Sequence, residues 1–388
     1  MMSKMLSEIT SVITKGTTPT SVGCSFSKNG INYIKSESIT SSRTLDKSKY
    51  AFISEETHQK LKRSQIKEND ILFSMAGMFL GKTGIVQADD VPANTNQAVA
   101  IIRIVPEQAN YLYVYYYLNQ KNIVTWINSL SGQSAQPNIN LKQIGEIEIP
   151  LPDRIIQDTI VEMLSAIDSR IELNTAINEN LEQQAQAIYA QMFIESAEES
   201  WETGSLSDIA VITMGQSPKG DTFNETGEGA VFYQGRTDFG FRFPTRRLYT
   251  TEPKRIALCG DALMSVRAPV GDLNVAYEEC CIGRGLAAIH SKDNHQSFVL
   301  YTLFTLKKQL DVFNGEGTVF GSINKESLNS MEITIPPREL MDRFESTVSP
   351  IDRAIRNNYE EICRLQAIRD TLLPKLMNGE IDVSAVKI

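Results

Sequence analysis

Two long stretches, residues 153–195 and 338–377, constrain the fold most, because their apolar residues recur at alternating steps of four and three. That spacing is typical of a coiled-coil seam rather than of the broader apolar face of an ordinary surface helix. The two seams also begin alike, since residues 167–174 and 351–358 both read I-D-x-x-I-x-x-N. The expected seam residues are Ile167, Ile171, Asn174, Asn178, Leu181, Ala185, Ile188 and Met192 in the first stretch and Ile351, Ile355, Asn358, Ile362, Leu365, Arg369 and Leu372 in the second.

Asparagines and prolines in the two helical stretches lead to two further predictions. A buried asparagine can fix the register of paired helices at some cost in stability, so we expect this role for Asn174 and Asn358. A proline inside a helix costs about 3 kcal/mol but little at the first helical position. We therefore expect Ser349 to cap a new helix that begins at Pro350, after a shorter docking helix. We expect Pro374 and Gly379 to end or kink the same helix.

The stretches between the helices form a repeat. The chain has 388 residues, and a chain of this length usually forms more than one domain, each with its own hydrophobic core. Residues 206–218 (LSDIAVITMGQSP) repeat the pattern of residues 6–19 (LSEITSVITKGTTP), and both segments end in a strand-like run before prolines. The sequence predicts a mixed α/β chain with an internal pseudo-two-fold repeat. The expected divisions are a globular domain at 1–152, a helical spacer at 153–199, a second globular domain at 200–337, and a helical spacer with a C-terminal tail at 338–388.

Composition excludes several classes of protein. No apolar run approaches the roughly 18 residues that a membrane span requires. The five cysteines show no C-x-x-C spacing and only three histidines accompany them, so we expect no metal site. This cysteine usage favours a reducing, cytoplasmic location.

The motifs of common enzymes are absent or incomplete. Residues 77–83 (GMFLGKT) place three residues between the glycines, whereas a phosphate-binding P-loop needs four. The corresponding residues 269–272 contain no lysine. No (Asn/Asp)-Pro-Pro-aromatic loop for adenine methylation is present, and no nucleophile, base and orienting group can be assembled. We therefore expect a chain without catalytic residues, metal or cofactor of its own.

Local sequence nevertheless suits DNA. The net charge is −9, but acidic residues concentrate in 151–200, and global charge says little about a local basic face. Residues 236–249 interleave arginines with aromatics, and residues 132–138 carry amides. Arginine can pair with guanine, and Gln or Asn with adenine. The alternative for residues 236–249 is an edge strand whose arginines are solvated. The alternative for residues 132–138 is a turn whose side chains hydrogen-bond to its own backbone. The candidate DNA-binding residues are Lys35, Arg43, Gln133, Gln136, Asn138, Arg236, Arg242, Arg246, Arg247 and Arg267.

Two blocks extend this interpretation to a family. Residues 265–289 read SVRAPVGDLNVAYEECCIGRGLAAI and residues 372–383 read LLPKLMNGEIDV. Together with the paired I-D-x-x-I-x-x-N helices, they make nearly the whole chain resemble the specificity subunit of type I restriction-modification systems. The resemblance implies that 1–152 and 200–337 are target-recognition domains, each reading half of a split site in double-stranded DNA. It also implies an antiparallel coiled coil that sets the spacing of the half-sites.

The resemblance further implies partners that carry the chemistry. Two methyltransferase subunits would dock on the helices and methylate adenine with S-adenosylmethionine. Two restriction subunits would be added in a system that cleaves, with ATP and Mg²⁺ bound there rather than on this chain. The alternative function is a non-catalytic scaffold whose repeated domains bind proteins instead of DNA. A strong salt dependence of DNA binding would distinguish the two, since phosphate contacts release counterions.

Overall fold

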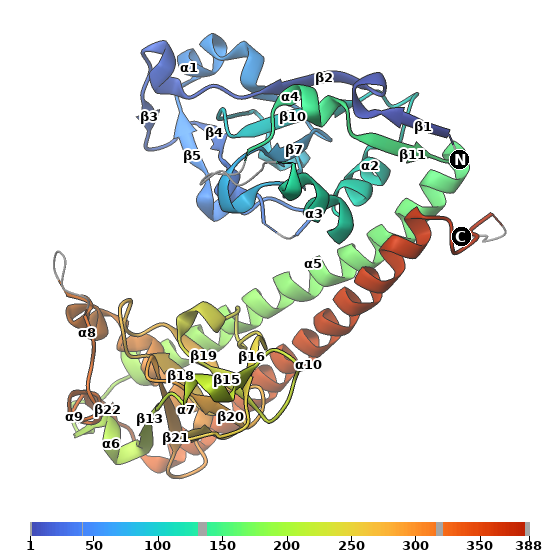
Figure 1. The fold of residues 1–388 in the computed structure, drawn as a ribbon. Coiled ribbons are helices and arrows are strands. Elements are labelled where there is room, and N and C mark those ends of the chain that lie inside the picture. The colour runs from blue at the N-terminus through green and yellow to red at the C-terminus, as the bar shows by residue number, and fades with distance from the viewer. Residues whose placement is uncertain (1, 41, 131–137, 316–320, 385–388) are drawn as a thin grey trace. The chain divides into compact units, whose positions relative to one another are not determined.

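The computed structural model describes residues 2–40, 42–130, 138–315 and 321–384 (Figure 1). The chain divides into two compact units, Met1–Leu173 with Glu361–Ile388 and Asn174–Glu360. Two long helices contribute to both units. They are α5 (Arg154–Ala190), which continues into a π-helical turn at Gln191–Glu195, and α10 (Arg338–Met377).

The first unit contains two sheets and a closing strand pair. An antiparallel four-stranded sheet has the order β2 (Thr10–Lys15), β10 (Val99–Ile104), β7 (Ile71–Ser74) and β8 (Thr83–Ile85). A five-stranded sheet has the order β3 (Phe26–Ser27), β5 (Ala51–Ile53), β4 (Ile31–Ile34), β9 (Ala93–Thr95) and β6 (Gln65–Ile66). Strands β1 (Met2–Met5) and β11 (Glu148–Leu151) close the module. The helices are α1 (Glu55–Lys60), α2 (Tyr111–Leu118), α3 (Lys121–Ser129) and α4 (Leu141–Gly145).

The second unit repeats this topology strand for strand. Its four-stranded sheet has the order β13 (Ala210–Met214), β21 (Leu286–Ser291), β18 (Ala262–Ser265) and β19 (Leu273–Val275). Its five-stranded sheet has the order β14 (Phe223–Asn224), β16 (Leu248–Thr250), β15 (Ala230–Tyr233), β20 (Cys280–Ile282) and β17 (Ile256–Ala257). Strands β12 (Glu202–Ser205) and β22 (Glu332–Ile335) close it, with helices α6 (Leu206–Ile209), α7 (Gln296–Thr305), α8 (Lys307–Asp311) and α9 (Lys325–Asn329). Both five-stranded sheets contain one parallel pair, β4 with β9 and β15 with β20. The predicted internal repeat is confirmed.

The long helices form part of the core of each unit. In the first unit, Ile160 and Leu164 of α5 and Leu376 of α10 pack with buried residues of β10 and α2. In the second unit, Phe193 and Phe344 lie 5.2 Å apart between ring centroids within the buried cluster. Burial of such aromatic side chains is a large hydrophobic contribution. Each module is therefore built onto its portion of the helices rather than merely tethered to them.

The two helices pair antiparallel within each unit. In the first unit, Arg170 of α5 forms an ion pair of 2.8 Å with Glu361 of α10. In the second unit, the Nδ2 of Asn358 donates a hydrogen bond of 2.8 Å to the Oδ1 of Asn178. Each predicted seam residue is buried or half-buried. Asn358 thus pairs with Asn178 rather than with Asn174.

The expected start of a new helix at Pro350 is wrong. Helix α10 is continuous through Pro350, and Ser349 is an interior residue. The helix ends at Met377, between Pro374 and Gly379, and Gly379 has a positive φ of 72°. Pro350 removes one main-chain donor, but Phe344 and Val348 before it and Ile355 after it are fully buried. Tertiary packing on both sides of the proline therefore outweighs the local cost, as it commonly does for helices in proteins.

Candidate nucleic-acid interface

A three-residue turn in the second unit presents an arginine on a tightly packed loop. Strand β20 ends at Ile282 and β21 begins at Leu286, so Gly283, Arg284 and Gly285 form the turn. A Cβ added to Gly285 would lie 2.5 Å from the carbonyl oxygen of Gln234. Only glycine permits this approach. The packing holds the backbone of exposed Arg284 in place.

The loop that follows β13 packs against this turn. A Cβ added to Gly215 would lie only 2.1 Å from the carbonyl oxygen of Gly283, so the two loops approach closely. The main-chain amide of Arg284 donates a hydrogen bond of 3.2 Å to the Oγ of Ser217. A hydroxyl residue of the G-Q-S-P segment therefore contacts the turn that carries the arginine.

Arginine side chains surround a cavity of about 410 Å³ beside the turn. Arg236, Arg267 and Arg284 line it and are exposed. Among the residues that the structure describes, no carboxylate lies within ion-pair distance of Arg267 or Arg284. Two guanidinium groups are thus available to a phosphate or to the acceptor edge of a guanine. The cavity is also lined by the polar residues Ser217, Gln234, Thr237 and Ser265.

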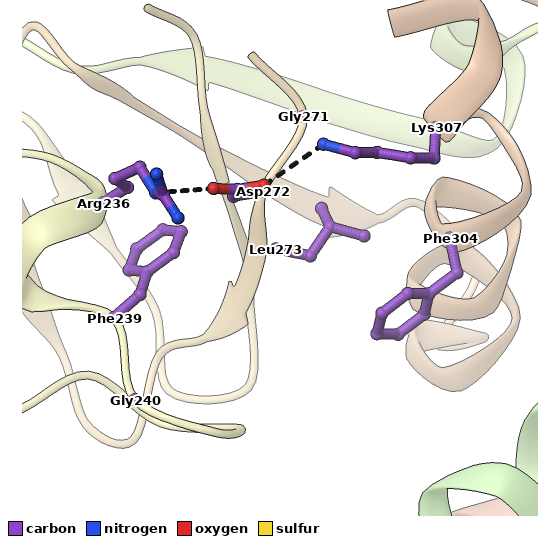
Figure 2. Close-up of a pocket in the computed structure, with 8 residues that line it drawn as sticks. All are labelled: Arg236, Phe239, Gly240, Gly271, Asp272, Leu273, Phe304 and Lys307. Carbon is purple, nitrogen blue, oxygen red and sulfur yellow. Dashed lines mark hydrogen bonds and ion pairs between the residues drawn. The ribbon is translucent and has the colours of Figure 1, made fainter. Parts of the chain in front are cut away.

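Arg236 is less available for binding a nucleic acid, because its guanidinium forms an ion pair with the carboxylate of Asp272. Figure 2 shows Asp272 between Arg236 and Lys307, in a second cavity of about 460 Å³. The Nε of Arg236 lies 2.6 Å from one oxygen of Asp272, and the Nζ of Lys307 lies 3.1 Å from the other. These ion pairs position the arginine on the rim of the 410 Å³ cavity.

Two of the other predicted arginines also have carboxylate partners. Arg246 pairs with Glu278 at 2.5 Å, and Arg247 pairs with Asp238 at 3.1 Å. The hydrogen bond from Arg246 to Glu278 raises the pKa of the arginine, although burial opposes the shift. Both arginines remain about half exposed. Glu278 is bound through the Nε of Arg246, and Asp238 through the Nε and Nη2 of Arg247, so each guanidinium keeps N–H groups for a phosphate.

Arg242 is buried, a position that does not favour the predicted contact with DNA. Its side chain is only 5% exposed, and its Nη2 donates a hydrogen bond of 2.9 Å to the hydroxyl of Tyr301. The same nitrogen lies 3.5 Å from carboxylate oxygens of Glu182 on α5 and Asp352 on α10. Burial opposes the charge of Arg242, but Tyr301, Asp352 and Glu182 outweigh it and raise the pKa of the guanidinium. Arg242 fastens the second module to its helices.

In the first unit, Arg43 has the same kind of structural position. Its Nη2 and Nε donate to the two carboxylate oxygens of Glu172 on α5, at 2.8 and 3.2 Å. The side chain is 14% exposed, and its role in DNA binding stays a prediction. This bidentate pair occupies the edge of the guanidinium formed by Nε and Nη2.

The remaining candidates of the first unit are more open. Lys35 is paired with Glu37 at 3.5 Å and remains partly exposed, while Asn138 is exposed and bridges to Ala76. Gln133 and Gln136 lie outside the described residues.

Gln97 in the first unit is a further candidate that no local sequence motif indicated. It is exposed in the turn Asn96–Ala98 between β9 and β10, and its Oε1 accepts a hydrogen bond from the hydroxyl of Thr18. A Cβ added to Gly16 would lie 2.0 Å from the carbonyl oxygen of Thr95. The sequence signal is the repetition of the segments G-T-T-P and G-Q-S-P. Thr18 of the first contacts Gln97, and Ser217 of the second contacts Arg284.

Comparison with known proteins decides the family. The model described as "Type I restriction modification DNA specificity domain" matches residues 1–183 and 198–362. The chain belongs to this family. The specificity subunit is 30% identical, over 92% of its length and 88% of the relative's, to a Methanocaldococcus jannaschii protein assigned as the MjaX specificity subunit of a type I restriction enzyme. It is 24% identical to the MjaIX specificity subunit of the same organism, over 77% of this chain and 76% of that one.

The comparison with solved structures supports the fold. The crystal structure of a type I restriction-modification S subunit from M. genitalium matches with a TM-score of 0.58 at 17% identity. The match covers 97% of the specificity subunit described here and 95% of that chain. At this identity the likeness concerns the fold alone.

The specificity subunit is a non-catalytic DNA-recognition component of a type I restriction-modification system, with DNA and other subunits of the system as partners. Within the described part of the chain, no three His, Cys, Asp or Glu residues come together as a metal site. None of the described helices is long and apolar enough to cross a membrane. The candidate site is lined by arginine, serine, threonine and glutamine side chains, so its chemistry is that of hydrogen bonding and charge.

Proposed function

We propose that this specificity subunit recognises a bipartite DNA target, with each globular module reading one block of bases. The observation that carries the proposal is that two modules of the same topology present different polar side chains at equivalent turns. These side chains are Gln97 in the first unit and Arg284 in the second. Hydrogen bonds from such groups to base edges carry sequence information, whereas phosphate contacts mainly position the protein.

We further propose that the long helices bind two methyltransferase subunits, and that restriction subunits join in a system that cleaves. Leu173 and Ile177 lie one turn apart on α5 and are 51% and 38% exposed. Ile368 on α10 is also exposed. Exposed apolar side chains on a helix suit a protein partner. On this proposal, S-adenosylmethionine, ATP and Mg²⁺ bind to the partners, and this chain selects where they act.

Selection of bound DNA from a random-sequence library tests the proposal. The subunit would be used together with its methyltransferase partner, and binding would be measured at several salt concentrations. We expect two short enriched blocks separated by a gap of constant length and unspecified sequence. The logarithm of the affinity should fall linearly with the logarithm of the salt concentration. A scaffold that binds proteins instead would enrich no sequence.

A further inference from the structure

The main-chain hydrogen bonds place Gln97 and Arg284 at the same position of the repeat. In the first unit, the amide of Gly16 donates 3.2 Å to the carbonyl of Val99, two residues after Gln97. In the second unit, the amide of Gly215 donates 2.9 Å to the carbonyl of Leu286, two residues after Arg284. The two turns are therefore equivalent in register.

A second hydrogen bond fixes the other side of each turn. The amide of Thr17 donates 3.0 Å to the carbonyl of Thr95, and the amide of Gln216 donates 2.9 Å to the carbonyl of Ile282. The next residue of each loop, Thr18 or Ser217, then supplies the hydroxyl that contacts the turn residue. The backbone frame is repeated, while the side chain that it presents has changed.

We propose that these two turn residues determine different bases in the two blocks. Arg284 reads a guanine in the block bound by the second module, and Gln97 reads an adenine in the block bound by the first. The proposal rests on the bipartite function proposed above and deepens it, because it assigns one base of each block to one residue. A residue that reads a base must have an exposed side chain, hydrogen-bonding groups that match the base, and a backbone that is held in place.

Arg284 meets these requirements. It is exposed beside the 410 Å³ cavity, and the close contacts of Gly283 and Gly285 restrict its backbone. No described carboxylate lies within ion-pair distance of its guanidinium group. Arginine donates two parallel hydrogen bonds to the O6 and N7 of guanine, an arrangement that no other base offers in the major groove.

Gln97 meets the same requirements, but its side chain is an amide rather than a guanidinium. Its Oε1 accepts a hydrogen bond from the Thr18 hydroxyl, which orients the amide and leaves a second lone pair on that oxygen. A glutamine amide in this state can accept from the N6 of adenine and donate to its N7. The close approach of Gly16 to the backbone of Thr95 limits movement of the loop that carries Thr18.

Exchange of the two side chains tests the proposal. Arg284→Gln and Gln97→Arg each give one module the residue of the other, and both positions are exposed, so neither change should disturb folding. The targets of each variant, bound to the methyltransferase partner, would be selected from a random library. The control is Arg255→Gln, the same chemical change at an exposed residue outside the arginine cavity.

For Arg284→Gln we expect guanine to change to adenine at one position of one block, with the other block unchanged. For Gln97→Arg we expect the converse change in the other block. The preference for the original base should fall by about 5- to 150-fold, as for the loss of one bidentate contact. Arg255→Gln should leave both blocks as they are.

Two outcomes would overturn the assignment. An unchanged target would show that the turn does not read bases. A loss of affinity that is equal for all sequences, with a smaller salt dependence, would identify phosphate contacts instead. Failure of the bipartite function itself would look different, because the unmodified subunit would then enrich no pair of blocks.

Discussion

The hydroxyl of Tyr116 donates a hydrogen bond of 2.7 Å to the carboxylate of Asp168, and the same pair recurs in the second unit between Tyr301 and Asp352 at 2.9 Å. The aspartates belong to the repeated I-D-x-x-I-x-x-N motif. The tyrosines lie on α2 and α7, so each module is hydrogen-bonded to a long helix by an equivalent pair. Burial, with the charge of Asp168, raises the pKa of Tyr116, which keeps its proton on the hydroxyl.

Replacing the tyrosine should therefore weaken the attachment of the module. Tyr116→Phe removes the donor but leaves the Asp168 carboxylate buried, and a hydrogen bond to a charged group contributes about 1.5–3 kcal/mol. We expect the free energy of unfolding, measured with denaturant, to fall by this amount. The matched control is Tyr117→Phe on the same helix, where no described group bonds the hydroxyl. Equal effects of the two changes would contradict the role of the pair.

Substitution of Arg242 should lower stability, whereas substitution of Arg267 should weaken DNA binding. Arg242→Ala leaves two carboxylates without their partner, and because these are partly exposed we expect a loss toward the lower end of about 3–5 kcal/mol. Arg267→Ala should leave the melting temperature unchanged and weaken DNA binding, because its side chain is exposed beside the cavity. Calorimetry and a DNA-binding titration on both variants check this. The opposite assignment of effects would place Arg242 in the interface.

The buried side chain of Asn174 should lower the free energy of unfolding. Its side chain is 1% exposed, and its Nδ2 has no hydrogen-bond partner among the described residues. An unsatisfied buried donor costs about 1–3 kcal/mol, so Asn174→Leu should raise the free energy of unfolding by up to that amount. A lower melting temperature for Asn174→Leu would mean that the amide has a partner in the assembled complex.

The pair of Asn178 and Asn358 should behave differently. Asn178→Leu alone leaves the Asn358 amide without its 2.8 Å acceptor and should destabilise the chain. Leucine at both positions removes the unpaired group, so the double variant should recover stability while losing a constraint on register. A thermodynamic cycle over the four proteins measures this coupling. Additive effects of the two single changes would contradict it.

The helices should also set the gap between the two blocks, since both run without a break from one unit into the other. One additional heptad in α5 after Leu173, with one in α10 after Glu360, preserves the seam and adds about 10 Å at 1.5 Å per residue. At about 3.4 Å per base pair, the preferred gap should lengthen by about three base pairs. Both blocks should stay the same in a library selection. An unchanged gap would exclude this role of the helices.

The repeat and the paired helices could be predicted from sequence because they depend on local periodicity. The spacing of Ile167 and Ile171, and of Ile351 and Ile355, determines one helix face whatever the rest of the chain does. The continuity of α10 could not be predicted in this way. Whether Pro350 ends a helix depends on the burial of Phe344 and Val348 against another part of the chain.

The candidate site was harder to predict, for a related reason. An arginine in sequence carries no information about its partner, so Arg43 and Arg242 appeared equivalent to Arg267. Their carboxylate partners lie on helices far away in sequence, such as Glu172 for Arg43. Gln97 had no distinctive local motif, and its position became evident only from the register of the turn relative to Gly16.

Genome-wide mapping of methylated adenines, in cells with and without the gene for this chain, tests the central claim most directly. We expect one bipartite sequence to be methylated only when the gene is present, and methylation at other sequences to stay unchanged. Restoring the gene should restore the same pair of blocks with the same gap. An identical methylation pattern with and without the gene, in cells that contain the methyltransferase subunit, would contradict the account.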